Sequence, residues 1–463
     1  MDAAAMSASF SHSAAEHAQT VVVGLGVTGL SVARHLQRVG RPFTIVDSRE
    51  NPPELEVFQR EMPGVPLFFG AQAYAAIEGA ADLIVSPGIA LSEPWIQHAV
   101  DGGSRIRGDI DLFTEAAQAP VVGITGSNAK STVTALLGAM AAHAGRKVGV
   151  GGNIGTPALD TLAQERQLYV TELSSFQLER SGELALDVAT ILNVSPDHLD
   201  RHASLSAYVE AKRRIFLGAR CVVFNPEIPG TVPPSPMSTP SIIWRMSEPA
   251  GEEFGLREIA GQTWLMNGVQ PLLATQELAL PGRHNQANAL AALALGTAAH
   301  LPLESMLEVL RSFKGLSHRC ELIAEEFGVR WINDSKATNV GATLAAIEGF
   351  GDPHALILIA GGQGKGADFS PLADAIGRYC RHVLLFGEAA QEIGEHLRDA
   401  VDVTLCIDLA EAVVNAQAQV LRGDTVLFSP ACASFDQFAN FVERGEAFRT
   451  LVGRLHSGAG AKV

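Results

Sequence analysis

Short runs of β-branched and aliphatic residues alternate with helical patterns along almost the whole chain. In the first block, strands are predicted at Thr20–Val23, Pro42–Asp47 and Asp82–Ser86, with a helix that starts at about Thr28. Apolar runs of this length, each followed by a helical segment, are typical of parallel strands joined by crossover helices. The pattern therefore predicts an α/β protein built from parallel sheets.

A second block begins with the apolar run Ala119–Thr125, which leads through a loop into a helix predicted over Ser131–Ala144. Strands at Leu168–Glu172 and Val188–Asn193 continue this block. A buried strand that runs directly into a loop and a helix is the local arrangement in which parallel α/β sheets place phosphate-binding loops. This block is therefore expected to carry a nucleotide site.

A third block starts near Gly315, and its predicted strands are Val329–Asp334, Ala355–Ala360, His382–Phe386, Val403–Ile407 and Thr425–Ser429. A chain of 463 residues is too long for one hydrophobic core. We expect three domains: a Rossmann-like N-terminal domain (residues 1–108), a P-loop ATPase-type central domain (109–315) and a Rossmann-like C-terminal domain (316–463). Residues 226–240 hold six prolines and predict a surface loop rather than a domain joint.

Composition and charge exclude several classes of function. A net charge of −16, from 50 acidic and 34 basic side chains, argues against a nucleic acid or an anionic membrane as partner of the whole surface. The five cysteines are widely spaced and form no CxxC pair, which favours buried thiols in a reducing compartment. The first 18 residues lack the basic start of a secretion signal, and the longest apolar helical stretch, Ala289–Ala299, is too short to span a bilayer. We expect a cytoplasmic protein.

The sequence Gly24-Leu25-Gly26-Val27-Thr28-Gly29 lies between a predicted strand and a predicted helix, and Asp47 ends the next strand. This is the dinucleotide-binding fingerprint, in which glycines let the backbone approach a pyrophosphate and the acid meets a ribose hydroxyl. Its default interpretation is NAD binding, and the alternative is that the glycines serve only a tight turn. A dehydrogenase would not need a second nucleotide loop, however, and this chain has one.

That second loop is GITGSNAKST, at Gly123–Thr132. Backbone N–H groups at the helix start could cradle phosphates, Lys130 would reach the outer phosphates, and the Ser131 hydroxyl would contact Mg²⁺. The alternative is a merely structural strand–turn–helix, since Ile124 and Ala129 stand where the GxxxxGK[ST] pattern has glycine. We expect a negative φ at Ala129, because the left-handed conformation costs an alanine about 1–2 kcal/mol.

Three further polar residues are candidates for chemistry. Glu172 ends a strand that adjoins the phosphate loop and could hold Mg²⁺, although a solvated strand end explains it equally well. His198 lies in a dense polar sequence, residues 193–202, where a structural role competes with metal binding. Lys212, in a helix predicted over Ser206–Phe216, has the pattern of an ordinary surface lysine.

Polar loops follow three strands of the third block: Asn333–Asn339, Gly361–Lys365 and Ser429–Phe438. Loops at the carboxyl ends of parallel strands of one sheet should converge on one crevice. Lys336 and Lys365 in these loops indicate an acidic ligand. Solvated loops are the alternative for any one of them, but three together favour a site.

Eight motifs carry a resemblance: GITGSNAKST, GGNIG at Gly151–Gly155, ELSSFQLE, NVSPDHLDRH, RHNQAN, GLSHRCE, WINDSKATN and SPACASFDQF. On these motifs the chain resembles the Mur ligases from about Val21 to Leu455. Two of the sequences, DSKATN and SPACASFDQF, are similar to those of members that add D-glutamate. The resemblance implies an ATP-dependent amide ligation. ATP would phosphorylate the carboxylate of UDP-N-acetylmuramoyl-L-alanine, and the amine of D-glutamate would then displace phosphate.

The resemblance also implies a monomer that needs two Mg²⁺ ions and a carbamylated lysine, with small molecules as its only substrates. Ligation of L-glutamate stays open as an alternative, because geometry sets the stereochemistry of the acceptor. An NAD-dependent dehydrogenase and a P-loop kinase or nucleotide-gated binding module are the rival classes. A titration with NADH would distinguish the dehydrogenase from the ligase. An ATPase assay would distinguish the kinase or binding module from the ligase.

The resemblance assigns roles residue by residue. ATP would be held by Gly126, Ser127, Asn128, Ala129, Lys130, Ser131, Thr132, Asn288, Arg319 and Asp334. The metal ligands would be Ser131, Glu172, His198 and carbamylated Lys212, and the last three would act in catalysis with Lys130. The UDP-sugar would contact Val27, Thr28, Asp47, Ser48, Arg49, Gly88 and Asn153, so the fingerprint would bind UDP rather than NAD. D-Glutamate would contact Lys336, Thr338, Lys365, Ser434, Phe435 and Phe441.

Overall fold

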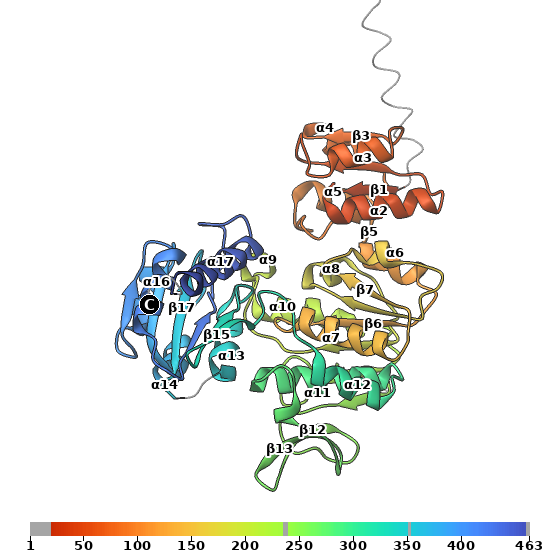
Figure 1. Cartoon of the computed structure of the whole chain (residues 1–463). Coiled ribbons are helices and arrows are strands. Elements are labelled where there is room, and N and C mark those ends of the chain that lie inside the picture. The colour runs from red at the N-terminus through yellow and green to blue at the C-terminus, as the bar shows by residue number, and fades with distance from the viewer. Residues whose placement is uncertain (1–19, 235–238, 351–352, 460–463) are drawn as a thin grey trace, which may run out of the picture. The chain divides into compact units, whose positions relative to one another are not determined.

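The computed structural model describes residues 20–234, 239–350 and 353–459 (Figure 1). The chain divides into two compact units, each of which is described by itself: residues 1–194, 198–245 and 291–306, and residues 195–197, 246–290 and 307–463. The amino-terminal segment considered for a secretion signal, and residues 235–238 of the predicted proline-rich loop, lie outside the described residues. Within the described ranges, no helix is both long enough and apolar enough to cross a membrane.

The first unit opens with a five-stranded parallel sheet in the order β3-β2-β1-β4-β5. Its strands are β1 (Thr20–Val23), β2 (Thr44–Asp47), β3 (Leu67–Phe69), β4 (Asp82–Val85) and β5 (Arg105–Arg107). Alternate side chains of β1 enter different cores. Val22 packs with α2 (Val27–Arg38) and α3 (Leu55–Glu61), whereas Val21 and Val23 pack with α4 (Ala71–Ala76) and α5 (Pro94–Asp101). Helices therefore cover both faces of this sheet.

A six-stranded parallel sheet in the order β11-β10-β9-β6-β8-β7 completes the first unit. Its strands are β6 (Val121–Thr125), β7 (Val148–Gly152), β8 (Leu168–Glu172), β9 (Val188–Ile191), β10 (Val222–Phe224) and β11 (Ser241–Ile243). Its helices include α6 (Asp109–Ala116), α7 (Lys130–His143), α8 (Ser175–Arg180), α9 (Leu199–His202) and α10 (Leu205–Arg213). One apolar cluster contains Leu25 and Leu30 from the first layer together with Phe113 and Tyr169 from the second, so the two sheets share a core.

The second unit contains two sheets. The smaller is antiparallel, with strands β12 (Phe254–Ile259), β13 (Gln262–Asn267) and β14 (Gln270–Ala274). The larger has the order β15-β16-β20-β17-β18-β19, with strands β15 (Glu321–Glu326), β16 (Val329–Asn333), β17 (Leu356–Gly361), β18 (Cys380–Phe386), β19 (Val403–Leu405) and β20 (Thr425–Phe428). Only β15, at its edge, pairs antiparallel among the described strands of that sheet.

Helices also cover both faces of the larger sheet, as the residues of two separate cores show. One core holds α13 (Val340–Phe350), α14 (Leu372–Tyr379) and α15 (Ala390–Leu397), and the other holds α16 (Leu409–Gln419) and α17 (Phe441–Ala459). Figure 1 shows α16 and α17 beside β17 at the blue end of the chain. Two more helices, α11 (Arg283–Ala298) and α12 (Leu303–Ser312), have residues in both units.

These observations confirm the predicted α/β class. The predicted strands are present, with ends that differ by up to two residues. The antiparallel strands β12–β15 were not predicted. The sequence of β15, ELIAEE, carries three glutamates and lies at a half-exposed edge, so it lacks the continuous apolar run of a buried parallel strand. All five cysteines are free thiols. Cys380, Cys406 and Cys432 are buried as predicted, whereas Cys221 and Cys320 are partly exposed.

A buried carboxylate lies where the first sheet's last strand leads into the second layer. Asp109, the first residue of α6, accepts a hydrogen bond at Oδ2 from Nε2 of Gln177 in α8 (2.9 Å). Among the described residues its other oxygen, Oδ1, is buried without a hydrogen-bond partner. Burial raises the pKa of Asp109 to about 6, although the Gln177 bond and the charge of Arg180 act in the opposite direction.

Asp109 should make the stability of the fold depend on pH. Its pKa is higher in the folded chain than the ordinary 3.8, so the folded state holds this proton more tightly, and stability is lost as the pH rises from about 4 to about 6. Asp109→Asn removes this ionisation. We expect the variant to gain on the order of 2–3 kcal/mol relative to wild type between pH 4 and pH 7, from a shift of about two pKa units.

Urea denaturation at several pH values would measure this difference. Asp101→Asn, at the exposed end of α5, controls for the loss of one surface carboxylate. A stability difference between Asp109→Asn and wild type that stays constant across this pH range would contradict the assignment.

Candidate functional site

The first glycine loop connects β1 to α2 next to the point where the strand order reverses between β1 and β4. The N–H of Gly24 donates to the carbonyl of Val46 (2.7 Å), and Gly24 has a φ of 97°. A Cβ at Gly29 would lie 1.9 Å from the carbonyl oxygen of Gly24, so no larger residue fits there. The glycines thus have a packing role, and they keep the loop close to the sheet edge at which such folds bind nucleotides.

Asp47 holds this loop through its carboxylate. Oδ2 accepts from the N–H of Leu25 (2.8 Å), and the Arg49 guanidinium and N–H donate to both carboxylate oxygens at 2.8–2.9 Å. Burial alone would raise the pKa of Asp47, but the bonds from Arg49 and Leu25 outweigh burial and lower it. Three of the predicted UDP-sugar residues therefore lie together here. Asp47 is hydrogen-bonded to Arg49, and Ser48 and Arg49 are exposed. Val27, at the start of α2, is exposed as well.

The predicted phosphate loop lies between β6 and α7 in the central sheet. The N–H groups of Ser127 and Asn128 donate to the carbonyl and the side-chain oxygen of Asn193 (3.0 and 2.8 Å). Nζ of Lys130 donates to the carbonyls of Gly126 (2.9 Å) and Ser127 (3.0 Å). The lysine is thus folded onto the loop that it is predicted to serve, and Asn193, from the loop after β9, fixes the loop's conformation. Ser131 and Thr132 are buried in the first turn of α7.

The prediction of a negative φ at Ala129 is wrong. Ala129 has φ 65° and ψ −7°, in the left-handed region, immediately before the first residue of α7. The chain must turn sharply there to bring the helix start against the strand end, which is why phosphate loops usually have glycine at this position. The surrounding contacts impose a conformation that costs alanine about 1–2 kcal/mol.

Glu172, at the end of β8, is buried rather than solvated. Its Oε1 accepts from Nδ2 of Asn153 (2.7 Å), whereas Oε2 is buried and, among the described residues, has no hydrogen-bond partner. A buried carboxylate oxygen without a donor fits a cation. The described residues contain no group of three or more His, Cys, Asp or Glu side chains that could hold a metal. Such a sparse site suits Mg²⁺, which is usually held by one or two protein oxygens together with waters and phosphate.

The interpretation of Lys212 as a surface lysine is wrong. Its side chain is fully buried, and Nζ donates to the carbonyl of Gly126 (2.9 Å) and lies 4.3 Å from the centre of the Tyr208 ring. Lys130 and Lys212 therefore share one carbonyl oxygen of the phosphate loop. The helix places Lys212 on the inner side of α10, and its burial depends on the loop 86 residues earlier in the chain.

His198 lies in an aromatic group that reaches this loop. Its ring packs edge-on against Phe176 (4.9 Å between centroids) and near Tyr208 (6.4 Å), and the Tyr208 hydroxyl lies 3.2 Å from Oγ of Ser127. His202 stacks on Phe176 and its Nε2 lies 2.9 Å from Oγ of Ser175. The structure therefore brings His198, Lys212 and the phosphate loop together. Tyr208, which links them, was missed, since its helical sequence pattern does not distinguish it from a core tyrosine.

The remaining predicted ATP contacts lie in the second unit. Asp334, just after β16, accepts from the N–H of Cys320 (3.1 Å) and from Oγ of Ser429 (2.8 Å). Burial raises the pKa of Asp334 to about 6, and the charge of Arg319 is among the influences that oppose this rise. Nδ2 of Asn288, in α11, donates to the side-chain oxygen of Asn285 (3.1 Å).

The three polar loops of the C-terminal sheet do converge. They follow β16, β20 and β17, which are adjacent parallel strands, and the loops of Gln363 and Ala433 pair through two backbone hydrogen bonds (2.9 and 3.0 Å). Nζ of Lys336 lies 4.2 Å from the centre of the Phe441 ring, and Nζ of Lys365 lies 4.9 Å from that of Phe435. Each predicted acceptor lysine thus has a predicted aromatic neighbour.

Arg444, in α17, was not singled out from the sequence, yet it joins two of these loops. Its buried guanidinium donates to the carbonyls of Ser335 (2.8 Å), Cys432 (3.0 Å) and Ala433 (3.1 Å). A charged residue one turn before Phe448, on the apolar side of a helix, is the signal that could have revealed it. Thr338 and Ser434, both predicted to contact D-glutamate, lie in the loops that Arg444 holds.

Fold and site together define a nucleotide-dependent α/β enzyme. It has a phosphate loop in its central sheet and a group of loops that carry lysines in its C-terminal sheet. Residues 18–108 match the family described as Mur ligase MurD-like, N-terminal domain, residues 124–296 the Mur ligase middle domain, and residues 318–432 the Mur ligase glutamate ligase domain. The chain belongs to the Mur ligase family. It is accordingly an ATP-dependent, amide-bond-forming ligase that uses Mg²⁺.

Among curated relatives, the UDP-N-acetylmuramoylalanine–D-glutamate ligase of Pseudomonas putida is 50% identical over 437 residues, which cover 94% of this chain and 97% of the relative. The enzyme of the same name from Pseudomonas aeruginosa is also 50% identical, over 94% of this chain and 98% of the relative. These matches cover nearly the full length of both chains.

Solved structures show the same fold at low identity. A pseudomurein peptide ligase type C from Methanothermus fervidus is 18% identical with a TM-score of 0.60, and covers 94% of this chain and 99% of its own. The UDP-N-acetylmuramate-alanine ligase of Thermotoga maritima is 20% identical with a TM-score of 0.58, over 96% of this chain and 100% of its own. These likenesses confirm the three-domain α/β fold class.

The strained Ala129 yields a prediction. Ala129→Gly should relieve the left-handed conformation and raise the free energy of unfolding by about 1 kcal/mol, while ATP-dependent turnover stays within several-fold of wild type. Denaturant unfolding and phosphate release would measure the two effects. Ala142→Gly, in the last turn of the same helix, is the matched control and should destabilise by about 1 kcal/mol, because glycine there loses helix propensity. If Ala129→Gly destabilised the protein, the inference that Ala129 is strained by its left-handed conformation would be contradicted.

Proposed function

We propose that the chain joins D-glutamate to UDP-N-acetylmuramoyl-L-alanine, with conversion of ATP to ADP and phosphate, in the synthesis of peptidoglycan precursors. The observation that carries the proposal is 50% identity, over nearly the full length of both chains, to relatives named for this ligation. The rival dehydrogenase does not account for the phosphate loop of the central sheet. We further propose that the enzyme acts in the cytoplasm as a monomer.

A carboxylate is a poor electrophile towards an amine, so it must be activated. In the proposed reaction it becomes an acyl phosphate, and the amine then displaces phosphate. Charge develops on phosphoryl and carbonyl oxygens, so positioned cations supply most of the stabilisation. Lys130 would leave the carbonyls of Gly126 and Ser127 to contact the transferred phosphate, while the remaining loop, fixed by Asn193, keeps its shape.

The Mg²⁺ that the family uses would neutralise phosphate charge. Glu172 and Ser131 would hold the first ion, because Glu172 supplies a buried oxygen that lacks a donor. His198 and Lys212 would serve a second ion. We propose that Lys212 is carbamylated, which is supported by its burial beside the phosphate loop: a carbamate would carry a negative charge where an ammonium would repel a cation.

The two other substrates would bind on separate sheets. The loops of Val27–Thr28 and Asp47–Arg49, together with Gly88 and Asn153, would receive the UDP-sugar. In the second unit, Lys336 and Lys365 supply two positive charges for the two carboxylates of D-glutamate. Asn288, Arg319 and Asp334 would contact ATP from that unit.

Phosphate release tests the proposal directly. Release should require ATP, UDP-N-acetylmuramoyl-L-alanine and D-glutamate together, and it should fall to background when L-glutamate or another amino acid replaces D-glutamate. Lys130→Ala should abolish release and yet keep the affinity for the UDP-sugar, because the lysine lies on the phosphate loop and not on the first sheet. Turnover with L-glutamate alone, or without the UDP-sugar, would overturn the proposed substrate pair.

The carbamate is tested separately. Lys212→Ala should lose at least a hundredfold in turnover, and short carboxylic acids such as acetate or formate should restore part of it by supplying the missing negative charge. Thermal melting should show that the variant is folded. Arg213→Ala, at the partly exposed neighbour that pairs with Glu210, is the control and should stay near wild type. Near-normal activity of Lys212→Ala would show that the lysine is only structural.

A further inference from the structure

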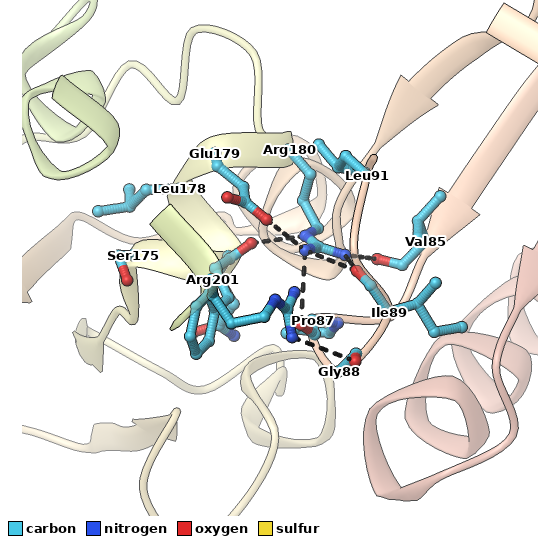
Figure 2. Close-up of polar contacts among 12 residues, drawn as sticks. Val85, Pro87, Gly88, Ile89, Leu91, Ser175, Leu178, Glu179, Arg180 and Arg201 are labelled. Atoms are coloured by element: carbon cyan, nitrogen blue, oxygen red, sulfur yellow. Dashed lines mark hydrogen bonds and ion pairs between the residues drawn. The ribbon is translucent and has the colours of Figure 1, made fainter. Parts of the chain in front are cut away.

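Arg180 ends α8 with a guanidinium that is completely enclosed (Figure 2). Nη1 donates to the carbonyls of Ser86 (2.6 Å), Ile89 (3.2 Å) and Val85 (3.3 Å). Nη2 donates to the carbonyls of Ile89 (3.2 Å) and Pro87 (3.4 Å) and to Oε1 of Glu179 (2.8 Å). One side chain of the central layer therefore donates to four backbone carbonyls at and after the end of β4.

This loop contains Gly88, which is exposed and has open space where a Cβ would stand. In a trans peptide the carbonyl of one residue and the N–H of the next point in opposite directions. Because the Pro87 carbonyl faces Arg180, the N–H of Gly88 is directed away from it, to the outer side of the loop. A cation bound to the carbonyl also strengthens that N–H as a donor, since hydrogen bonds in series polarise one another.

Two further contacts keep the loop in this orientation. Oγ of Ser86 donates to the carbonyl of Gly24 (3.1 Å), which ties the loop to the first glycine loop. Nη1 of Arg201 donates to the carbonyl of Gly88 (3.4 Å), and its guanidinium lies 4.7 Å from the centre of the Phe176 ring. Figure 2 shows Arg180 and Arg201 on the same side of the loop.

The other end of α8 belongs to the catalytic region of the central sheet. The helix begins three residues after Glu172, and Ser175, its first residue, lies 2.9 Å from Nε2 of His202. Glu179 balances the charge of Arg180 and also lies 3.7 Å from Nδ1 of His202. A six-residue helix thus connects the loop of Gly88 rigidly to the end of the strand that carries Glu172.

We propose that Arg180 is a positioning residue for the UDP-sugar: it holds the loop of Gly88 so that the N–H of Gly88 is directed outward, and α8 connects this loop to the strand that carries Glu172. This inference rests on the proposed function, in which Gly88 contacts the UDP-sugar. Without Arg180 the buried carbonyls lose their donor, the loop populates other conformations, and substrate binding must first order it. Binding of ATP and D-glutamate does not use this loop.

Arg180→Lys keeps the charge but has fewer donors, in a different geometry. We expect its KM for UDP-N-acetylmuramoyl-L-alanine to rise at least tenfold, its KM values for ATP and D-glutamate to stay within twofold, and its kcat to fall by less than tenfold. Calorimetric titration with the UDP-sugar alone should show the same loss of affinity. Arg220→Lys, an exposed arginine paired with Asp187 in the same unit, is the matched control and should behave as wild type.

Arg201→Ala removes the partly exposed side chain that donates to the carbonyl of Gly88. This variant tests the same loop if Arg180→Lys does not melt cooperatively. It should raise the KM for the UDP-sugar about threefold and leave that for ATP unchanged. The positioning role would be overturned if folded Arg180→Lys bound the UDP-sugar with the affinity of wild type. If Arg180→Lys is unfolded, the same result in Arg201→Ala would overturn it. Failure of the wild-type protein itself to bind the UDP-sugar would instead overturn the proposed function.

Discussion

In parallel sheets the carboxyl ends of all strands meet at one edge, and every candidate site of this chain depends on that constraint. The phosphate loop follows β6, Glu172 ends β8 beside it, and Asn193 follows β9 on its other side. Since β9, β6 and β8 are neighbours, their polar ends come together without any long connection, and Asn193 is hydrogen-bonded to the phosphate loop. The acceptor loops after β16, β20 and β17 repeat this arrangement in the second unit.

Buried cations that bind backbone carbonyls are the second recurrent feature. Arg180 donates to carbonyls of the loop of residues 85–89, and Arg444 donates to those of residues 335, 432 and 433. A buried charge is costly unless it is well hydrogen-bonded, and several carbonyl dipoles around one cation meet this need. The same bonds hold irregular loops in one conformation. Positive charge is therefore concentrated at the loops, although the chain as a whole carries a charge of −16.

The fold alone does not decide which amino acid is added. Solved ligases with 17–20% identity to this chain share its fold, and the name of one refers to alanine whereas that of another refers to D-alanyl-D-alanine. Specificity must therefore come from the loops that the sheets present. In this chain the loops proposed to receive the acceptor contain Lys336, Lys365 and the aromatic residues beside them, and Arg444 binds two of these loops.

The sequence by itself determined the class of sheet, the position of most strands, the two glycine loops and the strand-end location of Glu172, because these follow from local periodicity and turn chemistry. Family motifs added the proposed roles of His198 and Lys212, which no local pattern supports. Only the tertiary structure decided that Lys212 is buried, that Ala129 is left-handed and that Arg180 and Arg444 hold loops. These features depend on partners far along the chain: Lys212 and Gly126 are 86 residues apart, and Arg444 and Ser335 are 109 residues apart. The burial of a side chain depends on the residues that pack against it, and the local sequence does not indicate which distant residues these are.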